Sequence, residues 1–268
     1  MCRHLAYLGP PVSLASLVTE PARGLYEQSW APRRQRHGTV NADGFGLGWY
    51  PQRGPAQGPA QGPDGDGAAP PARYRRAVPI WADPNLPDLA RALHSTAVVA
   101  AVRDATVGTA QDETAAAPYA SGPWLFSHNG AVPDWQRLPD DLGIRLDAAT
   151  LLGLEARCDS ALLWALLHAR LVAGEPPGEA LARLTRRVRA VRPGARLNFL
   201  LSDGHTVAAT RCGDTLFHRS GPGSVLVASE PDAADGWREV PADSVLLATR
   251  SEITVTSLAL PSERNATV

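Results

Sequence analysis

The order of apolar and polar residues predicts strands in the first half of the chain. An apolar run, Leu5–Leu8, comes first, and Ser13 is placed to cap a short helix after it. Glycines that alternate with large apolar residues over 41–50 indicate a turn leading into a strand. The apolar run Ala97–Arg103, which ends in a charged residue, is typical of a buried strand, and Trp124–Ser127 predicts a shorter one.

The second half of the chain has the pattern of helices followed by strands. Ala148–Val172 has helical spacing with a break near Gly153, and Gly178–Val191 predicts a second helix. Beyond these, turn residues such as Asp-Gly and Pro-Gly separate short apolar segments. The strands expected there are Arg196–Ser202, Thr206–Arg211, Thr215–His218, Ser224–Ser229, Ser244–Thr249 and Glu252–Thr256. Strands, two helices and further strands predict an α+β fold class with packed sheets.

Residues 52–72 form a low-complexity segment rich in proline, glycine and glutamine. The segment has too few apolar side chains to offset the entropy lost on ordering, so we expect a disordered insert between two strands. The strand that returns from the insert is expected at Arg73–Trp81.

Composition and charge exclude several classes of function. The chain has 268 residues, 44% of them hydrophobic, which is enough for one large domain or two small ones. With 26 basic and 27 acidic residues the charges balance, so neither a nucleic-acid nor a membrane partner is expected. All the basic residues are arginine, which excludes a lysine Schiff base, a pyridoxal-phosphate anchor and a P-loop.

The three cysteines, Cys2, Cys158 and Cys212, stand far apart and in no metal-binding spacing. We therefore expect no metal, no cofactor and no disulfide framework. No N-terminal signal pattern and no apolar run long enough to cross a membrane is present. Together these features predict a reduced, cytoplasmic protein.

Cys2 is the first candidate for chemistry, because removal of Met1 would leave it with both a thiol and a free α-amine. An α-amine has a reference pKa of about 7.7–8.0, so near neutral pH it is partly an unprotonated base. Such an amine can activate the thiol beside it without a histidine, and a thiolate is a strong nucleophile for acyl transfer. A cysteine after the initiator methionine also arises by chance, so this signal alone is weak.

The second candidate is the sequence S-H-N-G at 127–130, directly after a predicted strand. The side-chain amide of Asn129 and the backbone N–H of Gly130 are suitable donors for the oxyanion of a tetrahedral intermediate. The alternative is an Asn-Gly hairpin turn, a common connection between two strands.

Two further segments can hold the ends of an amino acid. Arg103 ends a buried strand, where its guanidinium can bind a carboxylate, with the hydroxyl of Thr106 adding a bond. The alternative for Arg103 is an internal salt bridge. Asp159 precedes a predicted helix and can accept a hydrogen bond from a substrate ammonium, although an N-cap role explains it equally well.

The order of these motifs, an N-terminal Cys, R-x-A-T-x-G, S-H-N-G and C-D-S, resembles that of the class II, N-terminal-nucleophile glutamine amidotransferases. The resemblance covers essentially the whole chain. It implies one domain over 1–268 with a four-layer αββα sandwich fold, acting on a small-molecule γ-glutamyl amide. By resemblance, the site residues are Cys2 as nucleophile, Asn129 and Gly130 as oxyanion hole, Arg103 and Thr106 for the α-carboxylate, and Asp159 for the α-ammonium.

A closer resemblance is to the hydrolases of ergothioneine biosynthesis, which remove glutamate from γ-glutamyl-hercynylcysteine S-oxide. It rests on long segments such as MCRHLAYLGPPVSLASL, NADGFGLGWY, WLFSHNG and ASEP. The resemblance implies a thioester on the N-terminal cysteine and a cationic leaving amine, for which Trp30, Trp49 and Trp81 are candidate aromatic contacts. The family often has a tryptophan after the carboxylate-binding arginine, and this chain has Asp104 there.

Two other functions stay open from the sequence. One is a glutaminase subunit that supplies ammonia to a separate synthase. The other is a catalytically silent binding protein on the same fold, which an intact Met1 would favour because it blocks the amine. The residues give no indication of the oligomeric state.

Overall fold

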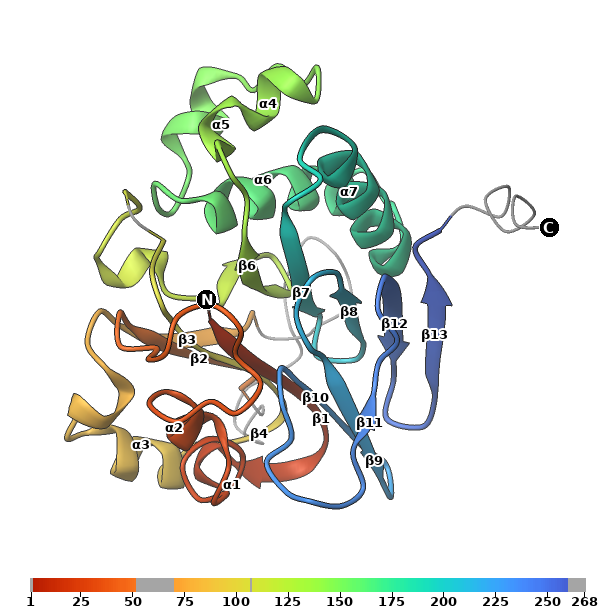
Figure 1. Cartoon of the computed structure of the whole chain (residues 1–268). Coiled ribbons are helices and arrows are strands. Elements are labelled where there is room, and N and C mark those ends of the chain that lie inside the picture. Colours follow the sequence, from red (N-terminus) through yellow and green to blue (C-terminus); the bar gives the residue numbers. More distant parts are fainter. Residues whose placement is uncertain (1, 52–69, 107, 260–268) are drawn as a thin grey trace, which may run out of the picture.

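Two antiparallel sheets lie face to face in the computed structural model, with helices against the outer face of each (Figure 1). The structure describes residues 2–51, 70–106 and 108–259. This arrangement confirms the expected α+β class and its αββα order of layers. The two sheets contact each other through their central strands, and the N-terminus lies near the middle of the molecule (Figure 1).

The first sheet contains seven strands in the order β11-β9-β10-β1-β4-β2-β3. Their bounds are β1 Arg3–Ser13, β2 Phe45–Trp49, β3 Ala72–Arg76, β4 His94–Val102, β9 Phe217–Gly221, β10 Ser224–Ala228 and β11 Arg238–Glu239. The second sheet contains six strands in the order β13-β12-β8-β7-β6-β5. Their bounds are β5 Tyr119–Ser121, β6 Trp124–Ala131, β7 Arg196–Ser202, β8 Val207–Arg211, β12 Ser244–Ala248 and β13 Ile253–Ser257.

Seven α-helices and three short 3-10 turns are found in the described residues. The helices are α1 Leu14–Val18, α2 Leu25–Gln28, α3 Leu86–Ala92, α4 Leu138–Asp141, α5 Ala148–Leu152, α6 Asp159–Val172 and α7 Pro177–Val191. The 3-10 turns are Ile80–Ala82, Glu113–Ala115 and Trp135–Arg137. As expected, Ser13 caps α1, and its hydroxyl accepts a hydrogen bond from the Ser16 N–H. Among these helices, none has the length and apolar content that crossing a membrane requires.

Three apolar cores separate the four layers. Small side chains such as Ala6, Ala97 and Ala209 fill the space between the two sheets. The long α6 and α7 pack a second core, which includes Leu163, against the outer face of the second sheet, and α1–α3 cover the first sheet. Burial of a leucine or valine side chain contributes about 1.5–3 kcal/mol, so these cores fix the position of both sheets.

The register of β1 decides what surrounds the start of the chain. Arg3 lies opposite Val102 of β4, so the preceding residue, Cys2, lies beside the end of that strand and Arg103. On the other side, Leu5 pairs with Ala228 of β10. Residues of β1 alternate between the two faces, so His4 faces the second sheet while Arg3 and Leu5 face the helices.

Several expected boundaries need correction. The strand β1 extends well beyond Leu5–Leu8, because its pairing with β4 continues past the proline pair to Ser13. The return strand β3 ends at Arg76 instead of Trp81, since the chain then turns through the Ile80–Ala82 turn. Most of the predicted insert, residues 52–69, lies outside the described residues, and Ala72 at its end already belongs to β3.

Candidate active site

A pocket of about 30 Å³ lies where β1, β4, β6 and α6 approach one another. Its lining includes Cys2, Arg103, Thr106, Gly130 and Asp159. These residues come from four separate parts of the sequence, and the fold brings them together as expected. The pocket is small, so it suits a slender group such as an amino-acid side chain.

Asn129 and Gly130 lie inside strand β6, so the hairpin-turn alternative is wrong. Asn129 pairs with Asn198 and Gly130 with Leu197 of β7, and β6 continues to Ala131. A side chain at Gly130 would place its Cβ only 1.9 Å from the Arg196 carbonyl oxygen, so the approach of β7 requires glycine there.

The side chain of Asn129 is not part of the pocket lining and is fully buried against the first sheet. Its amide nitrogen donates a hydrogen bond of 3.3 Å to the Ser229 hydroxyl. That hydroxyl also accepts the backbone N–H of His4 at 3.0 Å. Asn129 is therefore held next to the first residues of β1, and its amide retains a second N–H for another acceptor.

Arg103 is 7% exposed and is bound only by neutral acceptors. Its guanidinium donates to the Asp43 carbonyl at 3.3 Å, the Thr109 hydroxyl at 3.0 Å and the Ala110 carbonyl at 2.7 Å. Within the described ranges, no carboxylate lies at ion-pair distance from it, so the alternative of an internal salt bridge is wrong there. A buried guanidinium with only neutral partners is prepared for an anionic ligand.

Thr109, which no sequence motif singled out, provides a hydroxyl beside Arg103. The hydroxyl of Thr109 accepts from Arg103 and donates to the Thr106 carbonyl at 2.7 Å. Thr106 itself is exposed and lines the pocket.

Asp159 is the first residue of α6 rather than its N-cap, which is Cys158. Its carboxylate is 6% exposed and accepts the Val132 N–H at 3.0 Å and the Ser160 N–H at 2.8 Å. The Ser160 hydroxyl also lies 3.5 Å from it, so one of the roughly four lone-pair sites of the carboxylate stays available. The N-terminus of α6 also favours a negative charge at this point.

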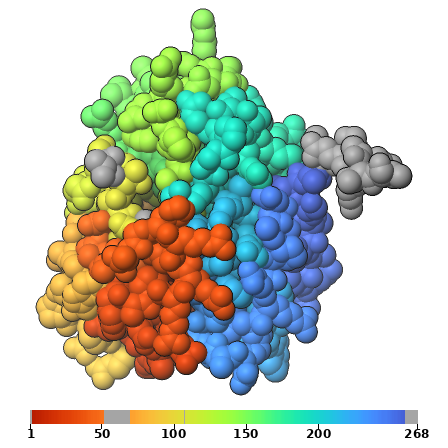
Figure 2. Space-filling model, in the orientation of Figure 1, coloured from red at the N-terminus to blue at the C-terminus, as the bar shows by residue number. Residues whose placement is uncertain are grey.

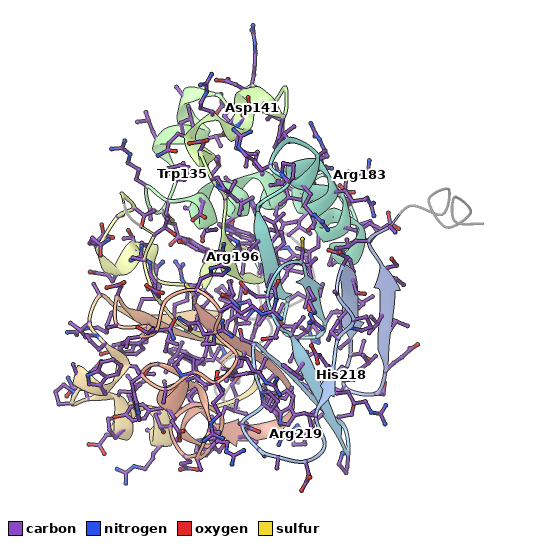
Figure 3. All side chains as sticks on the ribbon, in the orientation of Figure 1. Trp135, Asp141, Arg183, Arg196, His218 and Arg219 are labelled. Atoms are coloured by element: carbon purple, nitrogen blue, oxygen red, sulfur yellow. The ribbon has the colours of Figure 1, made fainter. Side chains whose placement is uncertain are left out.

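His128 and Ser160 also line the pocket. The Ser160 hydroxyl lies 3.0 Å from Nδ1 of His128, and Nε2 of the histidine lies 2.9 Å from the Arg196 carbonyl. Because a carbonyl only accepts, Nε2 carries the proton and Nδ1 accepts from the serine. Arg196, labelled in Figure 3, begins β7 and pairs with Ala131 at the end of β6.

A second thiol, that of Cys158, lines the same pocket as Cys2. Burial raises its pKa, and its sulfur lies 3.2 Å from the Tyr119 hydroxyl. Cys158 is therefore protonated at neutral pH and is a poor nucleophile. Among the described residues, no three His, Cys, Asp or Glu side chains gather to hold a metal ion.

Buried histidines give the site a testable pH dependence. Burial holds the pKa of His4 well below its usual value, with the positive charge of Arg3 acting in the same direction, and burial also lowers the pKa of His128. Below about pH 6.5 the unfolded chain takes up protons that the folded protein does not. The free energy of unfolding should therefore fall between pH 6.5 and 5, by up to about 1.4 kcal/mol per pH unit for each histidine.

Urea unfolding at pH values from 8 to 5 measures this slope. His4→Asn should reduce it, whereas the matched control His205→Asn, at an exposed histidine, should leave it unchanged. A free energy of unfolding that stays constant down to pH 5 would contradict the prediction.

The sequence and the fold both match known proteins. The family model for class-II glutamine amidotransferases matches residues 25–222. The chain belongs to the class-II glutamine amidotransferases. It is 40% identical over 259 residues to the gamma-glutamyl-hercynylcysteine sulfoxide hydrolase of Mycobacterium tuberculosis, covering 96% of this chain and 97% of that protein. It is 39% identical to the enzyme of the same name from Mycolicibacterium smegmatis, covering 96% of this chain and all of that protein.

A solved class-II domain protein from Silicibacter pomeroyi superposes with a TM-score of 0.66 at 22% sequence identity. The match covers 97% of this chain and 100% of that one, and at this identity it shows the fold alone. The four-layer sandwich of this class-II amidotransferase chain is thus that of the N-terminal-nucleophile hydrolases, as the resemblance implied.

Proposed function

We propose that this class-II amidotransferase chain hydrolyses the γ-glutamyl amide of γ-glutamyl-hercynylcysteine sulfoxide to glutamate and hercynylcysteine sulfoxide. Relatives that carry this activity in their names match at 39–40% identity over nearly their whole length. The observation that carries the proposal is one small pocket with a free thiol, a buried cation without an acidic partner and a buried carboxylate. We propose further that 1–268 acts as one domain, and that it works in the cytoplasm, where its three free cysteines stay reduced.

We call the pocket that Cys2, Arg103 and Asp159 line the acyl pocket. In the proposed binding mode it recognises the two charged ends of the glutamyl group. The guanidinium of Arg103 binds the α-carboxylate, with the exposed hydroxyl of Thr106 adding a hydrogen bond. The carboxylate of Asp159 accepts hydrogen bonds from the α-ammonium. Opposite charges on opposite walls orient the side-chain amide toward Cys2.

In the proposed mechanism, removal of Met1 exposes the α-amine of Cys2, which takes the thiol proton. The thiolate attacks the γ-carbonyl carbon, and the Asn129 amide and the Gly130 N–H stabilise the oxyanion. Collapse of this intermediate breaks the C–N bond, and the α-ammonium returns its proton to the leaving amine. The resulting γ-glutamyl thioester is hydrolysed by a water that the same α-amine deprotonates, which releases glutamate.

Two alternatives are weaker. A glutaminase subunit that supplies ammonia to a synthase would use the same acyl pocket, but the relatives with about 40% identity bear a hydrolase name. A silent binding protein needs no nucleophile, yet Cys2 lines the pocket together with Arg103 and Asp159. The mass of the purified protein distinguishes the hydrolase from the silent binding protein, because the proposed mechanism requires the loss of one methionine.

The substrate assignment predicts a strong preference among γ-glutamyl amides. We expect kcat/KM for γ-glutamyl-hercynylcysteine sulfoxide to exceed that for glutamine by at least about tenfold, since only the larger leaving group has contacts to gain outside the acyl pocket. Steady-state kinetics with both substrates test this. Equal values, or a better use of glutamine, would reject the sulfoxide and leave a general γ-glutamyl amidohydrolase.

A further inference from the structure

A second cavity, of about 410 Å³, lies between the segment around α2 and the residues that follow β10. Five charged side chains line it: Arg23, Glu27, Arg33, Arg34 and Glu230. They belong to the segment around α2 and to the segment that follows β10. Figure 2 shows the surface of the first 50 residues, in red and orange, directly beside that of the blue C-terminal strands.

Glu230 forms the fixed floor of this cavity. It is 3% exposed, and its carboxylate accepts the backbone N–H of Arg33 at 3.1 Å and that of Arg34 at 2.6 Å. Gln28 donates from its side chain to the Arg23 carbonyl at 2.8 Å. Arg33 and Arg34 are thus tied to the floor through their backbones, and Arg23 is linked to it through Gln28, whose side chain lies 3.5 Å from the Glu230 carbonyl.

The rim at 231–234 is also held in place. Asp232 accepts hydrogen bonds of 3.0 Å from both Arg219 and the Trp237 ring nitrogen. The guanidinium of Arg219, labelled in Figure 3, also lies 5.0 Å from the centre of the Trp237 ring. The cavity therefore has defined walls on both sides and needs little rearrangement to receive a ligand.

The cavity has a surplus of positive charge. Arg33 lies 3.7 Å from Glu27, whereas Arg23 and Arg34 have no acidic partner at ion-pair distance anywhere in the described part of the chain. The charge of Glu230 is offset from behind by Arg3, whose fully buried guanidinium interacts with it electrostatically. Three arginines against two glutamates leave a surplus of one positive charge in the lining, which favours an anionic ligand.

The position of the cavity relates it to the proposed nucleophile. The Ser229 N–H donates to the His4 carbonyl at 2.9 Å, which places Glu230 across from Arg3, the residue next to Cys2. Residues opposite each other on antiparallel strands lie about 4.5–5.5 Å apart. The acyl pocket lies on the β4 side of β1 and this cavity on the β10 side. The two cavities share no lining residue, and the pairing of β1 with the segment after β10 is what brings Glu230 close to the start of the chain.

We propose that Arg23 and Arg34 bind the carboxylate of the leaving amine, which makes the enzyme selective for γ-glutamyl amides of amino acids. This inference rests on the proposed hydrolase function. A leaving amine derived from cysteine carries a carboxylate on the carbon bonded to its nitrogen, whereas the ammonia released from glutamine carries none. The cavity therefore contributes only to the larger substrate.

The double variant Arg23→Ala/Arg34→Ala tests the inference. Its kcat/KM for γ-glutamyl-hercynylcysteine sulfoxide should fall about 10- to 100-fold, as expected for lost charge-assisted hydrogen bonds, while kcat/KM for glutamine stays within about twofold. Arg36→Ala is the matched control, because Arg36 is exposed on the same segment but does not line the cavity. An unchanged melting temperature confirms that the double variant is folded.

A pair of simple amides separates this inference from the proposed function. The wild-type enzyme should use γ-glutamylglycine better than γ-glutamylethylamide, which lacks the carboxylate, and the double variant should lose that preference. A double variant that keeps the preference, or loses equal activity on glutamine, overturns the inference. If the wild type uses glutamine as well as the sulfoxide, the proposed function fails, and the glycine-to-ethylamide ratio still decides the role of the cavity.

If neither simple amide is turned over, calorimetric binding measurements on Cys2→Ala variants test the role of the two arginines, because these variants bind substrate without reaction. The two arginine substitutions should then weaken binding of the sulfoxide substrate about 10- to 100-fold and leave binding of glutamate unchanged. Equal affinity for the sulfoxide with and without the arginines would overturn the inference.

Discussion

Replacing Cys2 with alanine should abolish hydrolysis while the protein still binds its γ-glutamyl substrate. The variant keeps the α-amine and the acyl pocket but has no atom to form the thioester, so kcat should fall by at least about 10³-fold. Binding should persist because Arg103 and Asp159 are untouched. Single-turnover release of glutamate measures the chemical step, and calorimetry measures binding.

The other two cysteines provide matched controls for this variant. Cys158→Ser and Cys212→Ser should retain activity, because both thiols are buried and burial raises the pKa of each. Glutamate release by the Cys2→Ala variant at the wild-type rate would show that another group forms the acyl-enzyme. Loss of activity in Cys158→Ser with an unchanged melting temperature would indicate that the neighbouring thiol takes part.

Substitutions at Arg103 should produce the second large effect. Arg103→Lys keeps the positive charge but loses the planar fork, which already bonds the Thr109 hydroxyl and the Ala110 carbonyl while facing the pocket. The substrate carboxylate would lose its guanidinium partner in a partly buried site, at a cost of about 2–5 kcal/mol. This corresponds to a decrease in kcat/KM of about 30- to 5,000-fold.

Steady-state kinetics and thermal unfolding together separate recognition from folding at this position. Asp159→Asn should lower kcat/KM by a similar factor, because the amide cannot pair with an ammonium charge. Arg73→Lys is a suitable control, since Arg73 lies on the edge strand β3 and pairs with Glu155 outside the pocket. Arg103→Lys with wild-type kcat/KM would place the carboxylate-binding residue elsewhere in the chain.

The aromatic residues suggested as contacts for the leaving group are placed unequally. Trp30 and Trp81 are exposed and pack edge to face with ring centres 5.7 Å apart, and Trp30 also contacts Tyr26 of α2. Trp49, in contrast, packs against the apolar core under α1–α3. Trp30 and Trp81 therefore stay candidates for a cation, whereas Trp49 has a role in packing.

Local sequence determined most elements and the order of the chemical groups. The spacing of apolar residues located the helices α6 and α7 and most of the later strands, because those periods depend on short stretches of chain. Motif order predicted that Cys2, Arg103, Gly130 and Asp159 meet in one pocket, and the structure confirms that they do. The roles assigned to them stay predictions.

Only the tertiary structure decided the alternatives that local sequence left open. Asn-Gly is a turn signal by itself, but β7 pairs with it and makes it part of a strand. The ion-pair alternative for Arg103 depended on the folded surroundings of its guanidinium, where the hydroxyl of Thr109 is a partner. Ser229 and Glu230 reach the start of β1 through the β10 pairing. The contact between Ser229 and the start of β1 joins residues more than 200 positions apart. The pairing register of such strands is fixed by the burial of whole sheet faces and not by the local spacing of apolar residues.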